Sequence, residues 1–188
     1  VRINKMISRI VSLLLILTIS PILIFLSIFI LIFDGRPILF RQERIGFKNK
    51  TFKIYKFRTM SNGTPDIPTH LIKNEGIKYT FMGKFLRKYS LDELPQLINI
   101  IKGEMNFIGP RPALYNQEDL IRERTKINIH HLKPGVTGWA QTNGRDELEI
   151  DEKVKMDFYY LKNQSFSLDI KILFLTFIKS IKSDSVFS

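Results

Sequence analysis

The sequence predicts a mostly helical α+β protein held at a membrane, with a small β-hairpin and amphipathic helices. Three observations predict it: residues 10–33 carry no charge, residues 37–59 read as two short strands, and residues 168–182 gather bulky apolar side chains on one helical face. The 188-residue chain has no cysteine, and 29 basic residues outweigh 18 acidic ones. This charge excess favours an anionic partner such as a lipid surface or a phosphorylated substrate.

The apolar segment comes first. As a straight helix, residues 10–33 would extend ~36 Å, which exceeds the ~30 Å bilayer core. Pro21 at its midpoint removes one backbone donor, and the Ser20 hydroxyl could bond a freed carbonyl and stabilise a bend. Basic residues flank both ends, and such flanks prefer the cytoplasmic side. The residues alone leave two interpretations open, one spanning helix or one re-entrant hairpin.

The next elements are a hairpin and a long loop. Phe52, Ile54 and Phe57 alternate with basic residues in the second strand. The basic residues either deter edge pairing or form a strip that faces lipid headgroups or a nucleotide. Residues 61–80 lack periodicity and contain two glycines and two prolines, so they predict a loop that is either a lid or simply mobile.

The second half of the chain returns to helical spacing. Residues 83–101 carry apolar side chains three and four positions apart, and Ser90 with Glu93 matches a capping box. Pro95 costs this helix a hydrogen bond. Residues 115–127 predict a charged surface helix. Residues 168–182 fit a helix lying in the membrane interface, and a core-facing helix has the same pattern.

The adjacent acids Asp92 and Glu93 are the first candidates for chemistry. Acids in the first turn of a helix are common for structural reasons, since they meet the positive end of the helix dipole. In a site, one could attack or hold a metal while the other transfers a proton. A helix start would depress the pKa of Asp92 and keep it ionised.

Candidate phosphate-binding groups lie on either side of this pair. Arg87, Arg111 and Arg145 carry guanidinium groups that match phosphate oxygens, although each alone is more typical of a surface. Pro110 and Pro112 make a rigid turn around Arg111. Three glycines between 135 and 144 mark a tight loop that could bring backbone donors to a phosphate. The sequence has no P-loop or dinucleotide fingerprint. The three histidines lack metal-site spacing, and Trp139 predicts packing.

Five ordered blocks give the chain a resemblance to a known family. They are Ser20-Pro21, FKIYKFRTM at 52–60, SLDELPQL at 90–97, KGEMNFIGPRP at 102–112 and KPGVTGWAQTNGR at 133–145. Together they resemble the bacterial sugar transferases, and among these the small monotopic phosphoglycosyl transferases of the undecaprenyl phosphate N,N'-diacetylbacillosamine 1-phosphate transferase type. Larger relatives carry transmembrane helices ahead of this domain, and the sequence shows none, which favours the small class.

The resemblance implies a reaction and a location. Members transfer a sugar 1-phosphate from a UDP-sugar to undecaprenyl phosphate, release UMP and start a lipid-linked glycan. They need Mg²⁺ and lie at the cytoplasmic face of the bacterial inner membrane, against anionic lipid and beside downstream glycosyltransferases. Residues 1–34 would be a re-entrant helix-break-helix hairpin with its break at Ser20-Pro21. Residues 35–188 would be the catalytic domain, with 61–80 as its mobile loop and 168–182 as its interfacial helix.

The resemblance also assigns roles to residues. Asp92 would attack the sugar-bearing phosphate, and Glu93 would either bind Mg²⁺ with Asp92 or deprotonate the lipid phosphate. Arg111, within its turn of two prolines, would hold nucleotide or phosphate, and Arg87 and Arg145 would contact phosphate oxygens. Two other functions remain as alternatives. One is a non-enzymatic scaffold for glycan-assembly enzymes. The other, a nucleic-acid binder, is disfavoured because the basic residues are dispersed and no stacking motif accompanies them.

Overall fold

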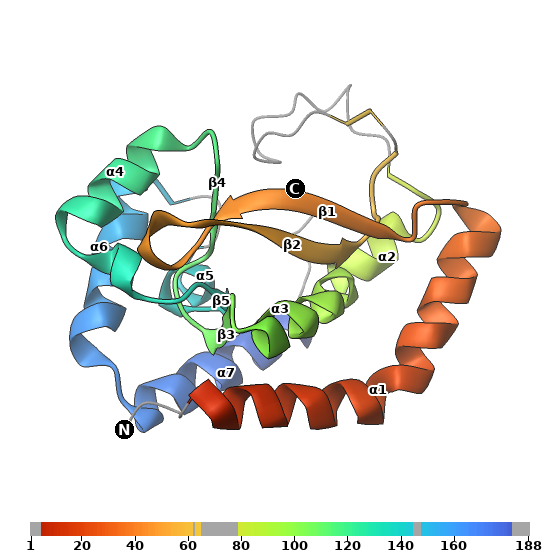
Figure 1. Ribbon diagram of the computed structural model, residues 1–188, viewed down its shortest axis with the longest axis horizontal. Helices are drawn as coiled ribbons and strands as arrows, with labels where there is room; N and C mark the ends of the chain where they lie inside the picture. The colour runs from red at the N-terminus through yellow and green to blue at the C-terminus, as the bar shows by residue number, and fades with distance from the viewer. Residues whose placement is uncertain (1–4, 62, 65–78, 145–147, 182–188) are drawn as a thin grey trace.

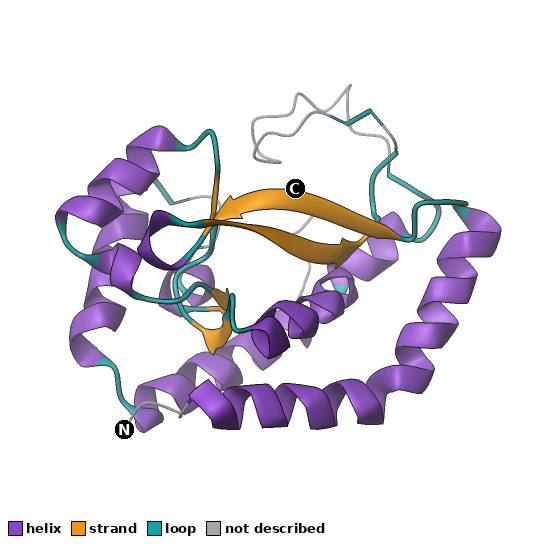
Figure 2. Cartoon of the chain, viewed as in Figure 1, coloured by secondary structure: helices purple, strands orange, loops and turns teal. Residues whose placement is uncertain are grey.

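The computed structural model describes residues 5–61, 63–64, 79–144 and 148–181, which form the predicted mostly helical α+β fold (Figure 1). A twisted hairpin lies at its centre, with helices around it (Figure 2). The strands are β1 (Leu39–Ile45), β2 (Thr51–Phe57), β3 (Asn106–Ile108), β4 (Ala113–Leu114) and β5 (Gly135–Thr137). The helices are α1 (Lys5–Phe33), α2 (Gly83–Lys88), α3 (Leu97–Lys102), α4 (Glu118–Lys126), α5 (Trp139–Thr142), α6 (Ile150–Asn163) and α7 (Phe166–Ile181), with 3₁₀ turns η1 (Phe47–Asn49), η4 (Leu91–Gln96) and η5 (Ile129–His131).

The predicted hairpin is confirmed. β1 and β2 pair antiparallel with Gln42 opposite Ile54, the connection runs through Gly46 and Asn49, and β4 adds a short third strand beside β1. A separate parallel pair joins β3 to β5. This second pair brings together two segments that lie about thirty residues apart in the sequence, and both of them border the cavity described below.

Helix α1 is continuous across Pro21 and bends in its middle part, so that one arm runs beneath the domain and the other rises along its side (Figure 1). Proline at position 21 cannot donate to the carbonyl of Leu17, four residues earlier. The Ser20 hydroxyl donates to that carbonyl instead, at 2.8 Å. The predicted replacement bond is therefore present, and it satisfies the acceptor that Pro21 leaves open.

The two faces of α1 have different surroundings. One stripe packs against the domain: Ser8, Ser12, Leu26 and Ile30 are buried, and the helix contacts α3. The opposite face exposes large apolar side chains along both arms, such as Leu17, Ile24 and Phe25. Met6–Phe33 is the one described helix long and apolar enough to cross a membrane, and only 11% of its most apolar window is buried.

The helical segment predicted over 83–101 is divided into α2, η4 and α3, and the α-helix expected to start at Ser90 is wrong because the chain forms a 3₁₀ turn there. Ser90 adopts a left-handed conformation, φ 55°, which ends α2 and starts the 3₁₀ turn η4, and Pro95 lies inside η4. The capping box is also wrong, because Ser90 makes no side-chain cap bond. Its carbonyl accepts the Glu93 backbone N–H at 3.2 Å instead. The left-handed Ser90 thus separates α2 from η4, the turn that carries the buried Asp92.

For α7 the sequence left two arrangements open, with the bulky apolar face either packed into the core or pointing outward. Ile170, Leu173, Phe174 and Phe177 are all more than 40% exposed, so the bulky face points away from the core. The other side packs inward through Ile172, which is fully buried. The predicted surface helix over 115–127 is confirmed as α4. Most of the predicted loop 61–80 lies outside the described residues.

Candidate active site

A cavity of about 810 Å³ opens between the hairpin, η4, α5 and α7. Eight basic side chains of the described residues line it: Arg44, Lys56, Arg58, Arg87, Arg111, Arg124, Lys153 and Lys179. The described lining residues include two carboxylates, Asp92 and Glu93. The same cavity reaches the apolar side chains of Leu15 and Ile19 on α1 and Leu173 on α7. A polyanion with an apolar part would therefore find both kinds of surface in one space.

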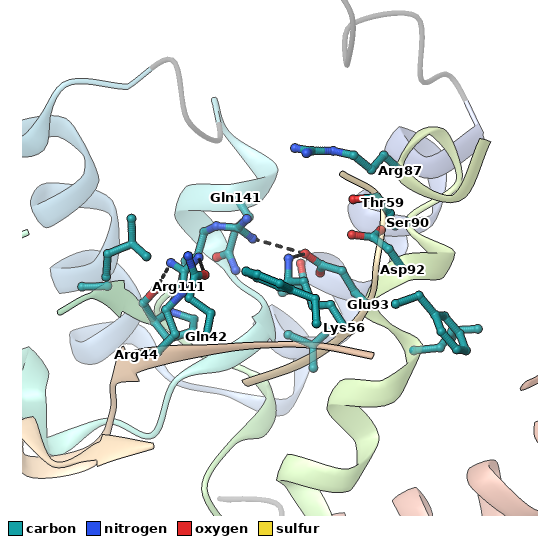
Figure 3. Close-up of a pocket in the computed structure, with 18 of the residues that line it drawn as sticks. Gln42, Arg44, Lys56, Thr59, Arg87, Ser90, Asp92, Glu93, Arg111 and Gln141 are labelled. Carbon is teal, nitrogen blue, oxygen red and sulfur yellow. Dashed lines mark hydrogen bonds and ion pairs between the residues drawn. The ribbon is translucent and has the colours of Figure 1, made fainter. Parts of the chain in front are cut away.

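Asp92 is buried, with 8% of its surface exposed, at the wall of this cavity (Figure 3). Burial raises its pKa to about 6, because a desolvated carboxylate resists ionisation. Lys56 opposes that rise, Glu93 adds to it, and Arg87 and Arg111 oppose it more weakly. The expected depressed pKa is thus wrong: six residues of 3₁₀ turn supply little dipole, and desolvation dominates.

Glu93 holds two cations in place. Its Oε1 lies 2.6 Å from Lys56 Nζ and 3.6 Å from Arg111 Nη1 (Figure 3). The sequence interpretation did not name Lys56 as a site residue. Strict alternation could have found it, because Lys56 shares a strand face with the buried Ile54, and β2 packs against η4. Lys56 therefore belongs to the site as closely as the predicted Arg111 does.

The turn at 110–112 is fixed on all three of its carbonyls. The Pro110 carbonyl accepts a hydrogen bond from the Gly135 N–H at 3.0 Å. The Arg111 carbonyl accepts one from Arg124 Nη1 at 2.8 Å, and the Pro112 carbonyl accepts one from Arg44 Nη1 at 3.1 Å. Arg44 also bonds the Gln42 side chain. A turn held at every acceptor presents the Arg111 side chain from a rigid base. The two prolines supply part of that rigidity, as predicted, and the two arginines behind them were not foreseen.

Arg124 is itself held by a buried carboxylate. Asp157 of α6 is 1% exposed, and its Oδ2 accepts from Arg124 Nε at 2.9 Å and from Nη2 at 2.6 Å. Burial raises the pKa of Asp157, and the paired Arg124 opposes that rise. The pair links α4 to α6 and anchors the Arg111 carbonyl through the remaining guanidinium nitrogen. Nothing in the sequence pattern connects positions 124 and 157.

Arg87 and Arg145 are the remaining predicted phosphate-binding residues. Arg87 projects into the cavity on the Asp92 side (Figure 3), and its guanidinium carbon lies 5.8 Å from the Tyr79 ring centroid. Arg145 lies outside the described residues. The predicted packing of Trp139 is confirmed, since its ring stacks on Tyr159 with 5.5 Å between centroids.

The donor set fits a magnesium ion that shares its ligands with a substrate. No group of three or more histidine or acidic side chains occurs among the described residues. Mg²⁺ prefers oxygen ligands and is commonly held by one or two carboxylates together with substrate phosphates. Asp92 and Glu93 supply two carboxylates beside an open cavity, which meets that requirement without a third protein ligand.

Comparison with known proteins identifies the family. A model of the bacterial sugar transferase family matches residues 1–183. The uncharacterized sugar transferase EpsL of Bacillus subtilis is 41% identical over 167 residues, covering 89% of this chain and 81% of EpsL. The UDP-glucose:undecaprenyl-phosphate glucose-1-phosphate transferase of Escherichia coli is 36% identical, covering 98% of this chain and 42% of that protein.

Relatives named for other sugars are about equally similar. The UDP-N-acetylgalactosamine-undecaprenyl-phosphate N-acetylgalactosaminephosphotransferase of Aeromonas hydrophila is 35% identical, covering 84% of this chain and 38% of that protein. The chain thus spans about four tenths of these named transferases and about four fifths of EpsL. A family match over nearly all its residues, and a relative above 40% identity, place the chain in the bacterial sugar transferase family.

Proposed function

We propose that this protein transfers a sugar 1-phosphate from a UDP-sugar to undecaprenyl phosphate and releases UMP, so that it starts a lipid-linked glycan. The observation that carries the proposal is Asp92, a carboxylate buried in a cavity lined by eight basic side chains. Two anionic substrates and an anionic nucleophile repel one another unless cations gather around them. The named relatives act on UDP-sugars and undecaprenyl phosphate, which supports the same substrate classes here.

The reaction would proceed in two displacements. An Asp92 carboxylate oxygen attacks the sugar-bearing phosphorus, the bond to the bridging oxygen breaks, and UMP leaves with that electron pair. A phosphate oxygen of undecaprenyl phosphate then attacks the same phosphorus and displaces Asp92, which gives the diphosphate-linked sugar. Three cations interact electrostatically with Asp92, and each of them lowers its pKa: Lys56, Arg87 and Arg111. They would balance the charge that builds up on the transferred phosphoryl group.

Glu93 is better suited to bind cations as a carboxylate than to act as a general base. Its carboxylate is paired with Lys56 and Arg111, and such pairing stabilises the ionised form. A phosphate monoester has a second pKa near ~6, so the lipid phosphate is largely ionised at neutral pH without a strong base. Glu93 and Asp92 would hold Mg²⁺ with the substrate diphosphate, and the ion would improve UMP as a leaving group.

Two apolar surfaces support a proposed membrane arrangement. Residues 1–34 would enter the bilayer as a re-entrant hairpin bent at Ser20-Pro21, and residues 35–188 would form the catalytic domain on the cytoplasmic face of the inner membrane. The bend of α1, its exposed apolar side and the basic flanks support this hypothesis. The outward face of α7 would lie in the interface with anionic lipid, and the cavity, which touches both helices, would receive a lipid phosphate directly.

A scaffold without activity explains the anchor but not the site. Burial of Asp92 destabilises its ionised form, and a docking surface gains nothing from such a carboxylate facing an open cavity. Catalytic groups are a recognised reason for perturbed pKa values of this kind. The cavity therefore favours the enzyme.

The decisive test is Asp92→Asn. We expect UMP release from a panel of UDP-sugars with undecaprenyl phosphate to fall at least ~1,000-fold, because an amide cannot serve as the nucleophile. The exposed acid Asp119 on α4 supplies a matched control, and Asp119→Asn should retain activity. Wild-type protein incubated with sugar-labelled UDP-sugar alone should carry the label on the peptide that contains Asp92. Full turnover by Asp92→Asn would refute the nucleophile.

A further inference from the structure

Gln141 is a buried side chain with both polar atoms unpaired. It is 8% exposed, and neither its Oε1 nor its Nε2 has a hydrogen-bond partner among the described residues. It is the one side chain in the described part of the chain with two buried atoms in that state, and it lines the cavity. Buried amides are normally bonded, so two unpaired atoms on a residue that lines a cavity point to a ligand.

Backbone packing fixes where this amide lies. Gly138, just before α5, approaches Gly109 so closely that a Cβ atom built on it would lie 2.1 Å from the Gly109 carbonyl oxygen and 2.5 Å from Gln141 Oε1. Gly109 precedes the turn that carries Arg111, so the close approach brings Gln141 beside that turn. Figure 3 shows Gln141 on the Arg111 side of the cavity, with Asp92 beyond Glu93 on the other side.

The chemistry of the amide restricts its ligand. Phosphate oxygens at neutral pH only accept hydrogen bonds, so a phosphate would pair with Nε2 and leave Oε1 open. A ligand that satisfies both atoms presents a donor next to an acceptor. The uracil ring does so, with its N3–H beside a carbonyl oxygen. In an in-line displacement at phosphorus the leaving group lies opposite the nucleophile, and Gln141 lies across the cavity from Asp92.

We propose that Gln141 binds the uracil of the UDP-sugar through its paired donor and acceptor, so that it holds the leaving UMP while Arg111 holds the phosphate. The inference rests on the proposed function, because that function supplies the uridine nucleotide. It adds a base-reading contact to a site whose other members carry charge. Alignment of the nucleotide by a neutral group also leaves the cations free to act on the phosphates.

Gln141→Ala and binding of UMP test this inference. UMP affinity is measured by calorimetry on the detergent-solubilised full chain, and KM for the UDP-sugar is measured from UMP release. We expect Gln141→Ala to weaken UMP and to raise KM by roughly 10- to 100-fold each, with the KM for undecaprenyl phosphate unchanged. Asn143→Ala is the matched control, because this exposed amide of the same segment bonds the Trp139 carbonyl, and it should match wild type.

A modified nucleotide makes the test specific to the base. 3-Methyl-UMP lacks the N3–H, so wild type should bind it at least ~10-fold more weakly than UMP, whereas Gln141→Ala should bind both equally. Persistence of that difference in Gln141→Ala would overturn the assignment to uracil. A raised KM with unchanged UMP affinity would overturn it too, since it would move the contact to the sugar. Absence of UMP release by wild type would instead refute the proposed function, and UMP binding would still report on Gln141.

Discussion

Asp92 combines two properties that oppose each other: burial makes its charge costly, and nucleophilic attack requires that charge. The neighbouring cations bring the pKa only down to about 6, still above the 3.8 that is usual for an aspartate. A carboxylate with this pKa is mostly ionised at neutral pH and becomes neutral in mild acid. The residue therefore gives the proposed reaction a measurable pH dependence.

We expect kcat/KM to fall below pH ~6, approaching tenfold per pH unit, because only ionised Asp92 attacks. Lys56→Met removes the cation that lowers this pKa most, so the acid limb should move to higher pH. The control is Lys53→Met, which removes the same charge from an exposed position on β2 and should leave the limb in place. The rate of pre-steady-state UMP release as a function of pH gives the acid limb of each variant. An acid limb that does not move in Lys56→Met would contradict the role of Lys56 in lowering the pKa of Asp92.

The same pKa has a consequence for stability. The folded state binds the Asp92 proton more tightly than the unfolded state, so the contribution of Asp92 to stability falls as pH rises from about 4 through 6. Asp92→Asn avoids this cost, and at pH 7.5 its free energy of unfolding should be higher by on the order of 3 kcal/mol. Denaturant unfolding in detergent measures the difference. An inactive but more stable Asp92→Asn protein would match a site residue; a less stable one would indicate a structural role.

At the level of single residues the sequence indicates several charged groups that line the cavity and misses those that position them. Asp92, Glu93, Arg87 and Arg111 were predicted, and all four line one cavity. Strict strand alternation would also have identified Lys56, because it shares a strand face with the buried Ile54. Contacts such as Arg124 with Asp157 depend on how separate helices pack, and no local pattern encodes that.

At the level of elements, the best-predicted parts have local causes. The hairpin follows from alternation and its turn residues, α4 from its charge pattern, and the Ser20 bond to the Leu17 carbonyl from the chemistry of proline. The helical character of 83–101 follows from its apolar spacing, whereas the 3₁₀ geometry of η4 does not. Tertiary packing overrides that spacing at Ser90, where the chain turns to bring Asp92 into the cavity.

The link between α4 and α6 yields a prediction with an internal control. Arg124 pairs with the buried Asp157, whereas Arg122 on the same helix pairs with exposed Asp119 and Glu123. Asp157→Ala leaves a buried guanidinium uncompensated and should lower the free energy of unfolding by about 3–5 kcal/mol. Arg122→Ala should change it by less than about 1 kcal/mol.

Arg124→Lys separates the positioning role from stability. Lysine can keep the ion pair with Asp157 but lacks the fork that also reaches the Arg111 carbonyl. We expect a several-fold higher KM for UDP-sugar with a smaller loss of unfolding free energy than in Asp157→Ala. Equal KM values in Arg124→Lys and wild type would show that the turn holds Arg111 without this contact.

On the scale of the whole molecule, two apolar surfaces and one charged cavity are arranged around the same hairpin. The outer sides of α1 and α7 expose large apolar side chains, and the cavity touches both helices. Relatives named for glucose, N-acetylgalactosamine and galactose are 36%, 35% and 33% identical to this chain. Relatives named for different sugars are thus about equally similar to the chain, and the architecture bears on the membrane more than on the choice of substrate.

The topology of α1 can be tested cleanly because the chain has no cysteine. Single substitutions Lys5→Cys, Ile22→Cys and Lys48→Cys probe the start of α1, its middle and the hairpin. A re-entrant α1 places positions 5 and 48 in the cytoplasm, since both flanks are basic and the helix bends between them. A membrane-impermeant maleimide should then label both in inverted vesicles and neither in intact spheroplasts.

Ile22→Cys should resist the reagent in both preparations and react once detergent removes the bilayer, because its exposed apolar face would contact lipid. Activity of each variant shows that the fold is retained. A spanning helix predicts a different pattern, with position 5 labelled in spheroplasts and position 48 labelled only in inverted vesicles. Since a hairpin carries both basic flanks on one side and a spanning helix separates them, the reactivity of position 5 decides between the two arrangements.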